Sequence, residues 1–94
     1  MISRRSLQFR EAFDQLPCEI KDLAKRVYEQ WHEDPFLPSL QFKNLHGAIY
    51  SVRIGDHYRA LGRKVDRADG DIEDTIVWHW IGTHERYNSL IRRL

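Results

Sequence analysis

The fold of this chain is decided by residues 49–62, which read IYSVRIGDHYRALG. Apolar and polar side chains alternate over the first six residues, Gly55-Asp56 interrupts the pattern, and an extended pattern then resumes. Alternation with a period of two residues, bounded by Gly and Asp, is typical of half-buried antiparallel strands. The stretch therefore predicts a β-hairpin with a two-residue turn at Gly55-Asp56.

A third strand is predicted by residues 76–81, IVWHWI, which are β-branched and aromatic. The three strands are expected at about 48–54, 57–66 and 73–82, with Asp69-Gly70 at the tip of the second hairpin. Residues 40–45 fit either a short strand or a turn. The sequence thus predicts an antiparallel sheet of three to four strands.

Two helices are predicted before the sheet, at residues 6–15 and 17–32, because apolar residues recur at helical spacing in both. Ser6 is a good N-cap for the first helix, and the pair Asp34-Pro35 ends the second. Thr83 is a good N-cap for a short last helix. The expected fold is α+β: one domain over residues 1–94, with an N-terminal helical hairpin packed on a small antiparallel sheet and a short C-terminal helix.

Composition narrows the function classes. The 94 residues carry a formal net charge of +1 and a single cysteine, Cys18, so we expect a cytoplasmic chain without disulfides. No apolar run is long enough to cross a membrane, and no signal peptide opens the chain. The five histidines lack metal-ligand spacing, and no nucleotide-binding or nucleophile motif is present. We expect no metal, no cofactor and no membrane partner.

Two arginines on the predicted hairpin are candidates for an anion site. Ser51 and Arg53 point away from the apolar side chains of their strand. A two-residue turn would place Arg53 near the position opposite His57, with Arg59 diagonal to it. Like charges on neighbouring strands repel unless an anion lies between them, and guanidinium groups bind phosphate well. The alternative is that both arginines are solvated or pair with carboxylates.

His84 follows Gly82-Thr83 at a strand-to-helix junction, where unpaired backbone N–H groups favour an anion. A histidine there is suited to act as general acid or base beside a phosphodiester, and the alternative is a plain surface histidine at a helix start. His79 is expected to be a packed or rim residue. The three tryptophans could stack bases, but we expect most of them in the core.

Several short motifs follow one another in an order that covers nearly the whole chain. They are Leu16-Pro17, Asp34-Pro35, Pro38-Ser39-Leu40, Phe42-Lys43-Asn44-Leu45, Tyr50-Ser51-Val52-Arg53-Ile54, Tyr58-Arg59-Ala60 and Trp78-His79-Trp80-Ile81-Gly82-Thr83-His84. This series resembles the RelE/ParE superfamily of toxins from bacterial type II toxin–antitoxin systems, and it is most similar to the RelE-like branch.

The resemblance implies two N-terminal helices on an antiparallel sheet, a short C-terminal helix, and a cognate antitoxin that neutralises the toxin in a hetero-oligomeric complex. Members of the superfamily commonly begin with a strand, which the first predicted helix here replaces. RelE-like members are endoribonucleases that cleave messenger RNA, usually on the ribosome, and so inhibit translation. The ParE branch has the same fold but poisons DNA gyrase, and a degenerate member would only bind its antitoxin.

The resemblance also implies roles for particular residues. Arg53 matches a basic residue of the first core strand, and Arg59 matches an arginine that stabilises the phosphate in the transition state. His84 stands where RelE itself has an arginine, but other nuclease members use a histidine near this end as acid or base. Tyr87 resembles a C-terminal tyrosine that stacks or orients the substrate. The candidate RNA-backbone contacts are Lys43, Arg63 and Arg86. Ser51 departs from the pattern, because RelE has a second basic residue at that position.

Overall fold

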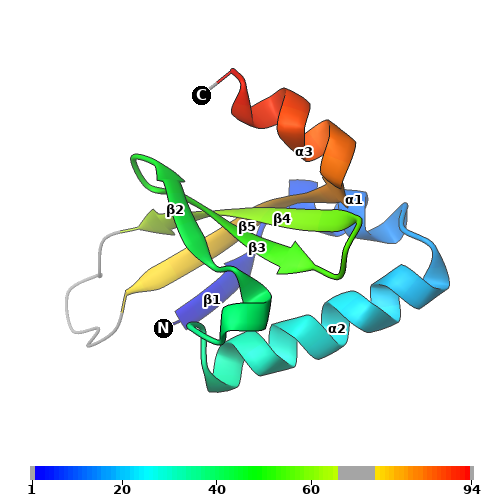
Figure 1. Ribbon diagram of the computed structural model, residues 1–94, viewed down its shortest axis with the longest axis horizontal. Helices are drawn as coiled ribbons and strands as arrows, with labels where there is room; N and C mark the ends of the chain where they lie inside the picture. The colour runs from blue at the N-terminus through cyan, green and yellow to red at the C-terminus, as the bar shows by residue number, and fades with distance from the viewer. Residues whose placement is uncertain (1, 66–73, 94) are drawn as a thin grey trace.

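The computed structural model describes residues 2–65 and 74–93 and shows a sheet between helices (Figure 1). In chain order the elements are β1 (Ile2–Arg5), α1 (Leu7–Asp14), α2 (Cys18–Glu33), the 3-10 helix η1 (Pro38–Leu40), β2 (Lys43–His46), β3 (Ile49–Ile54), β4 (Tyr58–Val65), β5 (Thr75–Thr83) and α3 (His84–Ile91). The α+β fold with N-terminal helices and a short C-terminal helix is confirmed.

The sheet has five strands in the order β1-β5-β4-β3-β2, one more than the highest number expected. Strands β2 to β5 are antiparallel, whereas β1 pairs in parallel with β5. The ambiguous stretch at residues 40–45 contains the end of η1 and most of β2.

The expectation that a helix replaces the N-terminal strand is wrong, because β1 precedes α1. This strand is held by long-range bonds that sequence periodicity does not record. The backbone N–H of Ile2 donates to the Asp74 carbonyl at 2.8 Å. The Ser3 Oγ accepts hydrogen bonds from the Tyr28 hydroxyl and from Nε1 of Trp78, both at 3.0 Å.

The turn between β3 and β4 is one residue longer than predicted. Ile54 is the partner of Tyr58, so three residues, 55–57, connect the strands. Gly55 adopts a positive φ of 63°, a conformation that favours glycine. In this register Arg53 lies directly opposite Arg59, and the predicted pairing with His57 is wrong. The predicted turn at Asp69-Gly70 lies outside the described residues.

The helix ends follow the predicted capping. Ser6 Oγ accepts from the Phe9 N–H at 3.1 Å, and Thr83 Oγ1 accepts from the Arg86 N–H at 3.3 Å. Helix α2 begins and ends one residue later than expected, with Asp34 at its C-cap. No helix within residues 2–65 and 74–93 is long and apolar enough to cross a membrane.

The core lies on one face of the sheet, against α1 and α2, while α3 lies on the other face (Figure 1). The sheet contributes Val52, Ile54, Ala60, Ile76, Trp78 and Ile81, and α2 contributes Ala24, Val27 and Trp31. Phe9 and Phe13 of α1 pack against this cluster. We call this the α2 face and the opposite one the α3 face. Because side chains alternate along a strand, each strand supplies residues to both.

Candidate functional site

The α3 face is polar where α3 meets the sheet. Ser51 on β3 is 2% exposed, and Tyr87 on α3 is 5% exposed. The Tyr87 hydroxyl donates to Ser51 Oγ at 3.3 Å. A buried hydroxyl needs such a partner, so the pair fixes the middle of α3 over β3. Ser51, which departs from the RelE pattern, therefore has a structural partner in this chain.

A cavity of about 300 Å³ opens beside this contact, between α3, the sheet and the segment leading into β2. Its wall includes all four predicted catalytic residues, Arg53, Arg59, His84 and Tyr87, together with Lys43. These residues come from β2, from the β3–β4 hairpin and from α3, and the fold brings these three parts of the chain together. Arg63 and Arg86 do not line the cavity and are exposed elsewhere.

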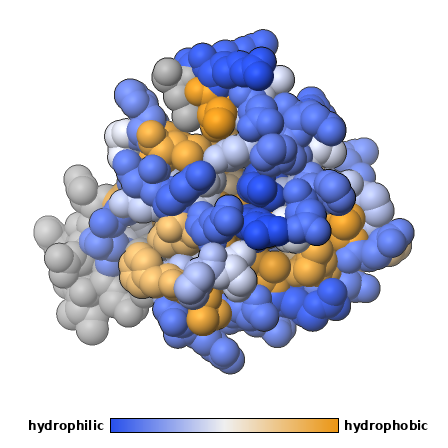
Figure 2. Space-filling view, in the orientation of Figure 1, coloured by the Kyte–Doolittle hydropathy of each residue, from blue (hydrophilic) through white to orange (hydrophobic). Residues whose placement is uncertain are grey.

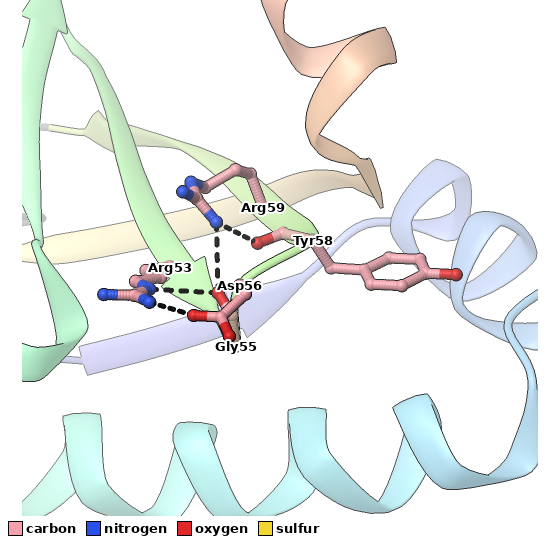
Figure 3. Close-up of polar contacts among 5 residues, drawn as sticks. All are labelled: Arg53, Gly55, Asp56, Tyr58 and Arg59. Atoms are coloured by element: carbon pink, nitrogen blue, oxygen red, sulfur yellow. Dashed lines mark hydrogen bonds and ion pairs between the residues drawn. The ribbon is translucent and has the colours of Figure 1, made fainter.

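The two arginines converge on the turn between β3 and β4 (Figure 3). Arg53 Nε and Arg59 Nη1 both donate to the carbonyl of Gly55, at 3.0 and 3.2 Å. Arg59 Nη1 also donates to the carbonyl of Tyr58 at 2.7 Å. Arg53 Nη2 forms an ion pair with Asp56. The turn therefore positions both guanidinium groups before any ligand arrives.

The surroundings of Arg59 change the pKa of its guanidinium group. Burial lowers the pKa of Arg59, and the facing charge of Arg53 lowers it further, whereas Tyr87 and Asp56 raise it. Two guanidinium groups on directly paired positions repel each other. A phosphate between them would relieve this repulsion through charge-assisted hydrogen bonds. The pair is thus suited to bind an anion.

His84 is the first residue of α3 and is half-buried. Its backbone N–H donates to the carbonyl of His57 at 2.7 Å, which fixes the helix start against the β3–β4 turn. Its Nδ1 lies 3.4 Å from Nδ2 of Asn88, and its ring packs on the Tyr87 ring with centroids 6.0 Å apart. Nε2 is then the ring nitrogen without a partner among the described residues.

Three polar residues of this site were not predicted. Gln41 and Asn88 line the cavity, and Asp56 pairs with Arg53 at its edge. Asn88 had a usable signal, because it stands four residues after His84 on the same helix face. Gln41 adopts a positive φ of 46° between η1 and β2, for which the sequence carried no indication.

The other histidine, metal and cysteine candidates of the sequence lie outside this cavity. His79 is half-buried, and burial, followed by the charge of Arg63, lowers its pKa. Within residues 2–65 and 74–93, no group of His, Cys, Asp or Glu side chains could hold a metal ion. Cys18 is exposed and free.

A second cavity, of about 440 Å³, lies on the α2 face. Aromatic and aliphatic side chains of α1, α2 and the sheet form most of its wall, and charged side chains such as Arg5, Lys25 and Glu29 also line it. Figure 2 shows apolar side chains gathered in the band between the sheet and α2. None of the predicted catalytic residues lines this cavity, so it is not the site that the sequence indicated.

Comparison with known proteins shows the family to which this chain belongs. The sequence profile of the ParE-like toxin domain matches residues 19–89, more than half of the chain. The chain belongs to the ParE-like toxin family. No curated protein matches it in sequence.

Two solved structures share the fold of this toxin. The YoeB/ParE toxin from Agrobacterium tumefaciens superposes with a TM-score of 0.64 at 14% identity, covering 89% of this chain and 99% of that one. A chain of the RelB-RelE antitoxin-toxin complex from Methanococcus jannaschii superposes with a TM-score of 0.65 at 19% identity, covering 93% and 96%. Identities this low bear on the fold alone.

Proposed function

We propose that this toxin is a metal-independent endoribonuclease that cleaves messenger RNA, in association with the ribosome, and thereby inhibits translation. The observation that carries the proposal is the shared cavity in which Arg53, Arg59 and His84 meet. It combines paired phosphate-binding groups with an imidazole, a group that can serve as general acid or base.

RNA cleavage without a metal requires three things. The 2′-hydroxyl must lose a proton as it attacks the neighbouring phosphorus, the leaving 5′-oxygen must gain one, and the charge of the pentacoordinate phosphate must be stabilised. Arg59 and Arg53 would bind the phosphate oxygens, since each is already held by the turn and needs little reorganisation. His84 would move one of the two protons through Nε2.

The remaining candidates would position the RNA. Lys43 lies exposed at the cavity and would contact the RNA backbone. Arg63 and Arg86, exposed outside it, would contact more distant phosphates. The Tyr87 hydroxyl is bound to Ser51, so its ring would act by holding the His84 ring beside the substrate.

The expected protein partner is a cognate antitoxin. The Methanococcus jannaschii neighbour was solved as an antitoxin-toxin complex, which supports such a partner for this chain. Toxin and antitoxin would form a hetero-oligomer in the cytoplasm.

The test is cleavage of a single-stranded RNA by the purified chain in the presence of a chelator. We expect products with a 2′,3′-cyclic phosphate and a 5′-hydroxyl, and no cleavage when the attacking 2′-hydroxyl is replaced by hydrogen. His84→Ala should lower the rate by about 10²–10⁴-fold. Arg59→Ala should lower it by about 10²–10³-fold, as the loss of one oxyanion-stabilising group does.

Matched controls separate these effects from general damage. His46→Ala removes an exposed histidine outside the cavity, and Arg26→Ala removes an exposed arginine on α2. Both should cleave as the unaltered chain does. In cells, His84→Ala and Arg59→Ala should each relieve growth arrest. The nuclease assignment fails if both variants remain fully active.

A second candidate is a gyrase inhibitor without catalysis, as the ParE-like profile suggests. Ser51 at the position of a RelE basic residue, and the pairing of Arg53 with Asp56, are the observations that favour it. Expression distinguishes the two candidates, because a nuclease leaves cut messenger RNA and a gyrase inhibitor leaves cleaved DNA held by gyrase. A degenerate member would leave growth untouched.

A further inference from the structure

The three tryptophans of this chain occupy different environments. Trp31 and Trp78 are 1% and 3% exposed, and their ring centroids lie 5.4 Å apart in the core. Trp80 is only partly buried. Among the described residues it forms no hydrogen bond and no aromatic ring contact. Part of the Trp80 ring therefore stays in contact with water.

A β-bulge explains why Trp80 leaves the core. On β5 the partner of Gly62 is Trp78, but the partner of Leu61 is Trp80, so His79 is an extra residue in the ladder. In a regular strand, residues two apart share a face, and Trp80 would lie with Trp78 against α2. The extra residue moves Trp80 to the α3 face.

The ring of Trp80 lies over Gly82. A Cβ atom at Gly82 would come within 2.6 Å of Trp80 Cζ2 and 3.0 Å of Cη2, so only glycine leaves room for the ring there. Gly82 is the cross-strand partner of Arg59. Paired positions on one face have Cβ atoms about 5 Å apart, so the indole lies next to the base of the Arg59 side chain.

We propose that Trp80 is a stacking platform for an unpaired RNA base next to the phosphate bound by Arg59. This inference rests on the proposed function and names its substrate as single-stranded RNA. Bases stack on aromatic rings with little sequence preference, since every base presents a π-face. Arg63 lies two residues beyond Leu61 on β4, so its side chain is on the same face as that of Arg59. Arg63 is exposed and can bind a further phosphate.

The test uses fluorescence and a short single-stranded RNA that carries 2′-fluoro groups and cannot be cleaved. Because Trp31 and Trp78 are buried, Trp80 supplies the emission that iodide can quench. We expect the RNA to change this emission and to protect it from iodide. Trp80→Leu should weaken RNA binding by about 5- to 150-fold, the range that stacking of one base supplies. Trp80→Phe should restore most of the affinity.

Two controls make the result specific. Phe36→Leu removes another exposed aromatic ring, which does not line the cavity, and should leave binding unchanged. Trp80→Leu should keep the salt dependence of binding, because stacking releases no counterions. Arg59→Ala should instead reduce the slope of log affinity against log salt by about 0.7, as expected for one phosphate contact on a single strand.

The outcomes separate this inference from the proposed function. Unchanged binding in Trp80→Leu, with the unaltered chain still cleaving RNA, overturns the stacking site and leaves the nuclease standing. Equal weakening in Trp80→Leu and Trp80→Phe also overturns it, since a purely structural role predicts no rescue by another aromatic ring. Failure of the unaltered chain to bind RNA at all overturns both.

Discussion

The two faces of the sheet are built from the same strands but have opposite chemistry. Strand β3 supplies Val52 and Ile54 to the α2 face, where they join an aromatic core beside a cavity of about 440 Å³. The same strand supplies Ser51 and Arg53 to the α3 face, where they line a cavity of about 300 Å³. The comparison shows that neighbouring side chains on one strand have different roles. One set packs in the core and stabilises the fold, and the alternate set lines the candidate site. Substitutions on the α2 face should therefore change the free energy of unfolding, and those on the α3 face should change RNA binding and cleavage.

The largest effect on stability is expected at Trp31. Trp31→Ala should lower the free energy of unfolding by about 3–5 kcal/mol, because it opens a large cavity in the core. Trp80→Ala, the matched change on the α3 face, should cost about 1 kcal/mol, the usual value for a point substitution. Urea unfolding followed by circular dichroism measures both. Equal costs for the two variants would contradict the division between the faces.

A smaller effect is expected where α3 contacts β3. Ser51→Ala and Tyr87→Phe each remove one side of the buried hydrogen bond. A double-mutant cycle from urea unfolding should give a coupling energy of about 0.5–1.5 kcal/mol. Additive costs would show that the two hydroxyls do not interact, and that α3 is held by apolar packing alone.

The ion pair at the edge of the cavity should have a modest effect on binding. The Arg53 and Asp56 side chains are 32% and 75% exposed, and exposed pairs contribute about 0.2–1 kcal/mol. Asp56→Asn frees Arg53 for phosphate and should tighten RNA binding by up to about fivefold. Asp22→Asn on α2 is the matched control and should change nothing. Weaker binding by Asp56→Asn would show instead that Asp56 positions Arg53.

The smallest effect is a pH dependence of stability from His79. Its pKa in the folded chain lies below the ordinary value of 6.5, so the unfolded chain binds more protons under mildly acidic conditions. The contribution of His79 to the free energy of unfolding is fully present above pH 6.5, and it is lost as the pH falls through the lowered pKa. His79→Gln should flatten that part of the curve in urea unfolding at about pH 7.5 and 5.5. A slope unchanged in His79→Gln would assign the pH dependence to other groups.

Much of the fold could be predicted because it rests on local rules. The caps at Ser6 and Thr83 involve residues three apart, and the alternation in β3 and the apolar stripe of α2 depend only on spacing. These patterns also placed Arg53 and Arg59 on the face away from the core. The candidate site residues were therefore named from the sequence, with help from a family resemblance.

The features that were missed depend on distant partners. Strand β1 contains four residues and is defined by its parallel pairing with β5, more than 70 residues away. The pairing of Arg53 with Arg59 depends on a turn of three residues in which Gly55 adopts a positive φ. Neither periodicity nor composition carries such information.

The sequence by itself determined which residues form helices and strands and which side chains of β3 turn away from the core, because these properties follow from local spacing and capping. Only the tertiary structure decided that Lys43, Arg53, Arg59 and His84 share one cavity, and that Trp80 leaves the core beside them. The physical reason is that contacts between residues far apart in the chain set three features. These are the strand register, the β-bulge in β5 and the packing of α3 against Ser51.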